Sequence, residues 1–154
     1  EDNAGSLHDK LMYLGAEAIL ETLDILATGT VKETPQSNSL HLKSAPKLFT
    51  ENTAIDWTKR GKQIIDIVRG LSPYPVAHSS FDGKKLLVYQ ASYEVAEHTH
   101  PVGTFISDGK KYLKVAVIDG YVTLEQIKIQ GKKLMPTAAL LNGYDISHLQ
   151  LPSE

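Results

Sequence analysis

The chain has 154 residues, 42% of them hydrophobic and 22% charged, which is the composition of a soluble globular protein of about one domain. It contains no cysteine, which excludes disulfides, a thiolate zinc site and a cysteine nucleophile. The formal net charge of −2 argues against a uniformly basic coat for nucleic acid.

The segment from Ser6 to Thr28 predicts a helix with Ser6 as its cap and Gly29 as its left-handed stop. Apolar residues recur along it at helical spacing, at Leu7, Leu11, Leu14, Ala18, Leu23 and Leu26. This stripe needs cover, so we expect a helix that faces a core.

From Thr30 to Thr53 the periodicity disappears, and Pro35 and Pro46 forbid regular helix. The segment is longer than ordinary connections within a domain, which have about 4 to 6 residues. We interpret it as a linker at a domain boundary.

A second helix is predicted over Thr58–Gly70, with Ile64, Ile65, Val68 and Leu71 on one face and with Pro73 and Pro75 beyond its end. Just before it, Asp56 is expected to cap the helix and Trp57 to be buried.

The remainder is typical of β-structure. Strands are predicted over 84–93, 104–106, 111–118 and 121–129, with Gly-containing turns at 82–83, 108–109, 119–120 and 130–131. Turns every ten residues or so favour a small, nearly closed barrel over a βαβ sheet. Pro136 begins a short helix that ends at Asn142-Gly143. Tyr74, Tyr89, Tyr93, Tyr112 and Tyr121 are expected at packed strand positions.

The charges are unevenly distributed. Residues 1–40 carry two lysines against seven acidic residues, whereas residues 41–154 carry 14 basic against 11 acidic residues. Lysine pairs at β-turns are usually a solvated rim, but several pairs on one barrel face would form a groove for a phosphate backbone.

No catalytic constellation stands out. There is no Gly-rich phosphate loop and no Ser elbow, and Ser79, Ser80 and His78 lack an orienting acid. His98 and His100 have no third metal ligand at a recognisable spacing, so we predict no metal site. The residues by themselves indicate a binding or positioning module.

No apolar run reaches the roughly 20 residues of a membrane span, and the acidic start at Glu1-Asp2 does not resemble a signal peptide. We therefore expect no membrane partner and a cytoplasmic location. Because the chain begins without Met, we interpret it as a piece of a longer protein.

Several motifs, in this order and spacing, resemble methionyl-tRNA formyltransferases: residues 6–16, 45–48, 55–57, 68–75, 119–120, 130–135 and 140–143. Residues 6–16 resemble the last helix of the formyltransferase domain, and the later strings resemble the linker and the C-terminal domain. The chain departs from the family at Tyr74-Pro75-Val76, where Trp-Pro-Gly is common, and at Leu134, where a third base is frequent.

The resemblance implies an α+β, mainly β fold: a small barrel of the oligonucleotide/oligosaccharide-binding type, preceded by a helix and an extended linker. It implies residues 1–29 as the terminal helix of a truncated catalytic domain, 30–53 as the linker and 54–154 as the barrel domain. The whole enzyme would transfer a formyl group from 10-formyltetrahydrofolate, its co-substrate, to the amino group of initiator methionyl-tRNA. The family's catalytic Asn, His and Asp and its folate loop lie upstream of residue 6, so this chain is expected to be inactive and to hold no cofactor.

By the same resemblance, the linker and barrel face the inner side of the tRNA. The candidates for phosphate contact are Lys43, Lys47, Lys59, Arg60, Lys62, Arg69, Lys132 and Lys133. Arg69, at a helix end, is also a candidate for a structural role. The expected partners are the tRNA, the protein's own N-terminal catalytic domain and, through the stripe of the first helix, a second copy of the chain.

An alternative remains open from the sequence. The barrel could belong to a sugar-nucleotide formyltransferase or a formyltetrahydrofolate hydrolase, where it would buttress the catalytic domain without binding tRNA.

Overall fold

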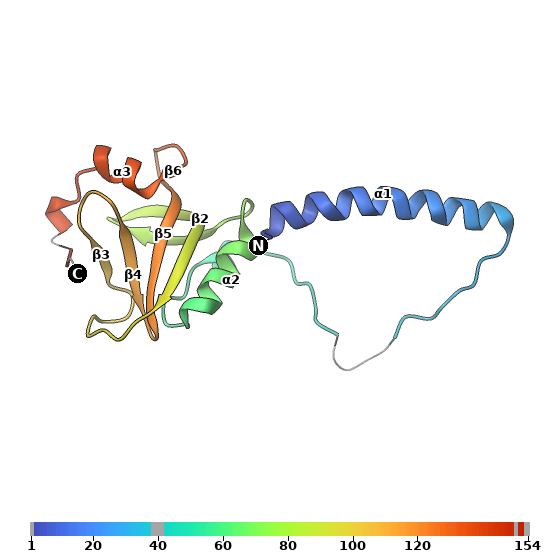
Figure 1. Cartoon of the computed structure of the whole chain (residues 1–154), viewed down its shortest axis with the longest axis horizontal. Helices are drawn as coiled ribbons and strands as arrows, with labels where there is room; N and C mark the ends of the chain where they lie inside the picture. The colour runs from blue at the N-terminus through green and yellow to red at the C-terminus, as the bar shows by residue number, and fades with distance from the viewer. Residues whose placement is uncertain (1, 38–41, 150, 153–154) are drawn as a thin grey trace.

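The computed structural model describes residues 2–37, 42–149 and 151–152. Figure 1 shows a long helix that projects from a small α+β body, with extended chain over residues 30–37 after the helix and over residues 42–50 before the body. In chain order the elements are α1 (Ala4–Thr28), η1 (Glu51–Thr53), α2 (Gly61–Leu71), β1 (Ala77–Phe81), β2 (Lys84–Val95), β3 (Phe105–Ser107), β4 (Leu113–Val117), β5 (Gly120–Ile129), β6 (Met135–Pro136), α3 (Thr137–Gly143) and η2 (Ser147–Leu149).

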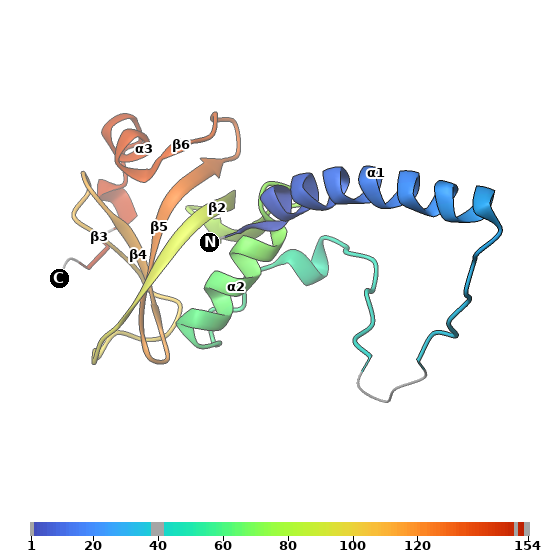
Figure 2. The same ribbon diagram turned by 45° about the vertical axis from the view of Figure 1, so that its right-hand side comes forward.

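The strands form one antiparallel sheet in the order β1-β2-β5-β4-β3, with β6 added to β5. The sheet curls into a half-barrel, and α2 lies across one side of it (Figures 1 and 2). A β-bulge in β2 between Val88 and Ala91 disrupts the ladder, and bulges of this kind increase local twist. The predicted α+β, mainly β fold, with a barrel-like sheet preceded by a helix, is confirmed.

The core lies between the sheet, α2 and α3. Alternate strand residues point inward, among them Leu86 and Val88 of β2 and Ile127 and Ile129 of β5, all fully buried. From α2 come Ile64, Val68 and Leu71, and from α3 come Leu140 and Leu141. Ile65, expected on the same helix face, is only partly buried at the margin of this cluster.

The second helix begins three residues later than predicted, and Asp56 does not cap it. The Asp56 carboxylate accepts hydrogen bonds from the backbone and hydroxyl of Thr58, which makes a local turn that competes with helix. The helix starts at Gly61, where Gln63 reaches back to accept from the Arg60 N–H. Trp57 is half-buried rather than buried and donates from Nε1 to Ser79 Oγ at 2.9 Å.

The first helix begins two residues earlier than predicted, and Ser6 is not its cap. Asn3 caps it, because Asn3 Oδ1 accepts from the Ser6 N–H while Ser6 Oγ accepts from the Asn3 N–H, a reciprocal capping box. Gly29, with φ of 69°, ends the helix as predicted.

The expectation that α1 faces a core is wrong for this chain. None of its residues is buried, and only its first turn touches the body, where the Gly5 N–H donates to Ser72 O at 3.1 Å. The helix then runs away from the sheet (Figure 1). Its large apolar side chains are about half exposed or more: Leu7, Leu11, Met12, Tyr13, Leu14, Ile19, Leu20, Leu23, Ile25 and Leu26. Among the described helices, none combines the length and the apolar character that spanning a membrane requires.

One strand is absent from the sequence predictions, and the expectation for the tyrosines needs correction. The short strand β1, with sequence AHSSF, was not predicted, because Ser and His are weak strand formers and its pairing with β2 supplies the order. Tyr74 lies outside any strand and is 85% exposed, and Tyr112 directly precedes β4, whereas Tyr89, Tyr93 and Tyr121 do occupy strands.

The C-terminal segment is fastened to the β1–β2 turn. Asp82 accepts hydrogen bonds from the Tyr144 hydroxyl and from His148 Nε2, and these bonds, that from Tyr144 first, hold the pKa of Asp82 below its usual value. Lys84 donates to the same Tyr144 hydroxyl at 2.7 Å. These hydrogen bonds tie the segment after α3, including η2, to the β1–β2 turn.

Candidate nucleic-acid interface

Four of the eight candidate residues belong to α2 or its approach, and we call them the α2 basic group: Lys59, Arg60, Lys62 and Arg69. The helix start is fixed by Asp119 of the β4–β5 turn, whose Oδ1 accepts from the Gly61 N–H at 2.9 Å. That hydrogen bond is the main cause of the lowered pKa of Asp119. Lys59, Arg60 and Lys62 are therefore held at the β4–β5 end of the sheet, whereas Arg69 lies in the last turn of α2, about 12 Å further along the helix.

Each member of the α2 basic group lies near a carboxylate. Lys59 pairs with Asp56 at 3.7 Å, and Lys62 and Arg69 both pair with Asp66, at 3.5 and 3.8 Å. The positive charge of Arg60 contributes to the lowered pKa of Asp119. Exposed pairs of this kind stabilise the fold by only about 0 to 1 kcal/mol. Their local effect is instead to cancel much of the positive potential that a phosphate would feel.

The two linker candidates lie on an extended strap outside the sheet. Lys43 and Lys47 are exposed in a segment without helix or strand. Lys47 lies over the ring of Phe49, with Nζ 5.5 Å from its centroid. These two lysines are not gathered with the α2 basic group by any described contact.

Lys132 and Lys133 lie at the far end of β5, in the turn between β5 and β6. Gly131, at φ of 83°, allows the turn, and the Lys132 N–H donates back to Ile129 O. Both lysines are exposed. Lys85 of β2 lies beside this turn, because the Gln130 N–H donates to Lys85 O at 2.9 Å.

The register of β2 and β5 brings a fourth lysine into this set. Leu87 is paired with Lys128, so Lys85 and Lys128 are diagonal neighbours on the outer face, opposite the buried Leu86 and Ile129. We call Lys85, Lys128, Lys132 and Lys133 the sheet-end lysines. Among the residues that the structure describes, none of the four has an acidic partner.

A hollow of about 390 Å³ lies within this set, lined by Lys85, Leu87, Lys128, Gln130 and Gly131. On the neighbouring strand β1, His78 is paired with Leu87. The pKa of His78 is lowered, first by burial and then by the positive charge of Lys85. Lys85 and Lys128 therefore place two positive charges on the outer face of β2 and β5 at this end.

The eight candidates do not form one surface. Lys59, Arg60 and Lys62 flank the Gly61–Asp119 contact and the sheet-end lysines adjoin residue 130, at opposite ends of β5. A strand of this length spans about 30 Å. The structure thus brings Lys132 and Lys133 together with Lys85 and Lys128, and separates them from Lys59, Arg60 and Lys62.

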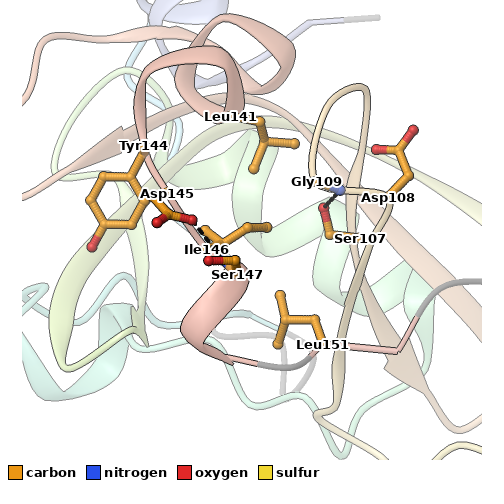
Figure 3. A pocket seen from close by; sticks show the side chains of 9 residues that line it. All are labelled: Ser107, Asp108, Gly109, Leu141, Tyr144, Asp145, Ile146, Ser147 and Leu151. Atoms are coloured by element: carbon orange, nitrogen blue, oxygen red, sulfur yellow. Dashed lines mark hydrogen bonds between the residues drawn. The ribbon is translucent and has the colours of Figure 1, made fainter.

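Another hollow, of about 330 Å³, lies between residues 107–109 and the C-terminal segment (Figure 3). Its polar lining includes Asp108 and Asp145, with the carboxyl group of Asp108 turned away from the hollow in Figure 3, and its apolar lining comes from Leu141, Ile146 and Leu151. Asp108 already accepts three backbone N–H groups and Asp145 caps Ser147. The negative charges of these two residues make this hollow unsuitable for a phosphate.

His98 and His100 are each hydrogen-bonded to a neighbouring part of the sheet. His98 Nε2 lies 2.7 Å from Val117 O, and His100 Nδ1 lies 3.0 Å from the Tyr121 hydroxyl. Over the described ranges, no group of three or more His, Cys, Asp or Glu side chains is placed to hold a metal ion.

Comparison with known proteins gives the following matches. Residues 47–145 match the family model of the formyl transferase C-terminal domain. The chain is 41% identical over 154 residues to a methionyl-tRNA formyltransferase of Bacteroides thetaiotaomicron and 42% identical over 155 residues to one of Phocaeicola vulgatus, with 95% of this chain and 48% of the relative covered in each case. The chain thus spans about half the length of the curated relatives it matches.

Among solved structures, HypX of Aquifex aeolicus in complex with tetrahydrofolic acid is similar in fold. Its TM-score is 0.59 at 24% identity, and the match covers 90% of this chain and 24% of HypX.

Proposed function

The chain belongs to the family of formyl transferase C-terminal domains, and we propose that it is the tRNA-holding part of a methionyl-tRNA formyltransferase. The observation that carries this proposal is the identity of 41 to 42% over 95% of the chain to proteins of that name. The positive outer face at the sheet end supports it, because a phosphate backbone is recognised first by its charge.

In the whole protein, a formyl group would pass from 10-formyltetrahydrofolate to the amino group of initiator methionyl-tRNA. We assign that chemistry and the folate co-substrate to the half of the relatives that this chain does not span. The described residues would contribute by holding the tRNA backbone, so the chain by itself is expected to transfer no formyl group. Its place of action would be the cytoplasm.

The test is a filter-binding titration of the 154-residue chain against initiator tRNA. Binding is expected at about 50 mM salt and should weaken steeply by about 200 mM, since each neutralised phosphate adds about 0.7 to 0.9 to the slope of log K against log salt. A chain that serves only to buttress a catalytic domain, as in a sugar-nucleotide formyltransferase, would not bind at either concentration.

We further propose that α1 is the last helix of the N-terminal catalytic domain, that residues 30–53 link it to the barrel, and that the apolar side chains of α1 pack within that catalytic domain. In the 154-residue chain those side chains are exposed. Large exposed apolar patches on a soluble protein drive association. We therefore expect the chain to self-associate through α1.

Sedimentation velocity provides the measurement. The chain should sediment above its monomer mass of 16.9 kDa, and replacement of Leu7, Leu11 and Leu14 with Gln should restore the monomer. The matched control replaces Glu17, Glu21 and Asp24 on the same helix with Gln and should leave association unchanged. A monomeric parent chain at high micromolar concentration would contradict the proposal.

A further inference from the structure

We propose that the sheet-end lysines, and not the α2 basic group, are the phosphate-contacting surface of this domain, and that Lys85 and Lys128 belong to it. The inference rests on the proposed function, because it takes an RNA backbone as the ligand. It adds two residues to the expected contact set and removes four from it.

The first argument is charge balance. Lys59, Lys62 and Arg69 each have a carboxylate within 4 Å, and Arg60 lies in the field of Asp119. A phosphate that approached the α2 basic group would have to displace those carboxylates or accept their repulsion. The sheet-end lysines have no such partners among the described residues, so a phosphate there meets uncancelled charge.

The second argument is the electrostatic repulsion between these lysines when no ligand is bound. Lys85 and Lys128 are diagonal neighbours across the β2–β5 ladder, and like charges on adjacent strands repel each other. The charge of Lys85 also acts on the neighbouring strand, where it adds to the larger effect of burial in lowering the pKa of His78. A phosphodiester backbone lying along this face would relieve that repulsion and release its own counterions.

The third argument is shape. Lys85 and Lys128 border the hollow beside Gln130, while Lys132 and Lys133 extend from the adjoining turn. Lysines on a strand and on a glycine-hinged turn present point charges without the planar fork that reads base edges. The surface therefore fits the sugar–phosphate backbone, independently of sequence.

The test compares four double variants of the 154-residue chain in the filter-binding titration with initiator tRNA, each of which loses two positive charges. Lys85→Gln with Lys128→Gln, and separately Lys132→Gln with Lys133→Gln, should each lower the salt slope by about 1.4 to 1.8 and weaken binding about thirtyfold at about 0.1 M salt. Lys59→Gln with Lys62→Gln should leave the slope unchanged. So should Lys110→Gln with Lys111→Gln, a pair on another turn.

Unchanged circular dichroism and melting temperature in all four variants establish that the fold is intact. If the parent chain binds tRNA and only the Lys59/Lys62 variant has a lower slope of log K against log salt, the assignment is overturned while the proposed function stands. If the slope of log K against log salt falls equally in all four variants, only net charge matters, and the assignment is again overturned. If the parent chain shows no salt-sensitive binding, the proposed function itself fails and the assignment with it.

Discussion

Gly120→Ala is expected to destabilise the half-barrel by about 4 kcal/mol, near the upper end for a single substitution. Gly120 begins β5 with φ of 151°, and a Cβ built there would lie 1.9 Å from the backbone oxygen of Glu94. The backbone at residues 119 and 120 cannot shift easily, because the Asp119 carbonyl accepts from both the Tyr93 hydroxyl and the Ala96 N–H. Relief of the clash would break the β4–β5 turn that also holds the start of α2.

Urea denaturation followed by the fluorescence of Trp57 measures this effect. Trp57 is the one tryptophan of the chain and packs edge-on to Phe105, so it reports on the body and not on α1. Gly131→Ala is the matched control for backbone conformation: its φ is also positive but nothing lies within 4 Å, so about 1 kcal/mol is expected. Equal losses in the two variants would show that the close approach at Gly120 is unimportant.

Much of the sheet could be predicted from the sequence because its signals are local. Alternating apolar residues and Gly-containing turns gave four strands, and the turn at Asp82-Gly83 is present as predicted. The strand before that turn was missed, since its order comes from pairing with β2, which is a tertiary effect. The predicted start of α2 is too early because the Asp56 carboxylate accepts from the Thr58 N–H in a local turn and does not cap the helix.

The candidate site was only partly predictable. Glycine turns and lysine pairs are visible in the sequence, but register decides which pairs meet, and here it brings Lys128 beside Lys85. Whether a basic residue is neutralised also depends on the fold, since Asp119 reaches the start of α2 from a distant turn. For α1, amphipathicity indicates that a face needs cover, but it does not indicate what provides it.

The attachment of α2 to the sheet gives the second large effect. Ile64→Ala should destabilise the body by about 3 to 4 kcal/mol. Ile64 is fully buried between α2 and the sheet, so its truncation leaves a cavity that the surrounding core cannot fill. Trp57 fluorescence in urea is again the measurement, since Trp57 packs against the same core.

Ile65→Ala is the matched control, because it removes the same atoms from the next residue of the same helix. Ile65 is only partly buried, so its loss should cost about 1 kcal/mol. The difference of about 2 to 3 kcal/mol isolates burial from helix propensity, which the two substitutions change equally. Equal losses at the two positions would mean that α2 is not seated on the sheet as described, and the placement of Lys59, Arg60 and Lys62 beside Asp119 would then fail as well.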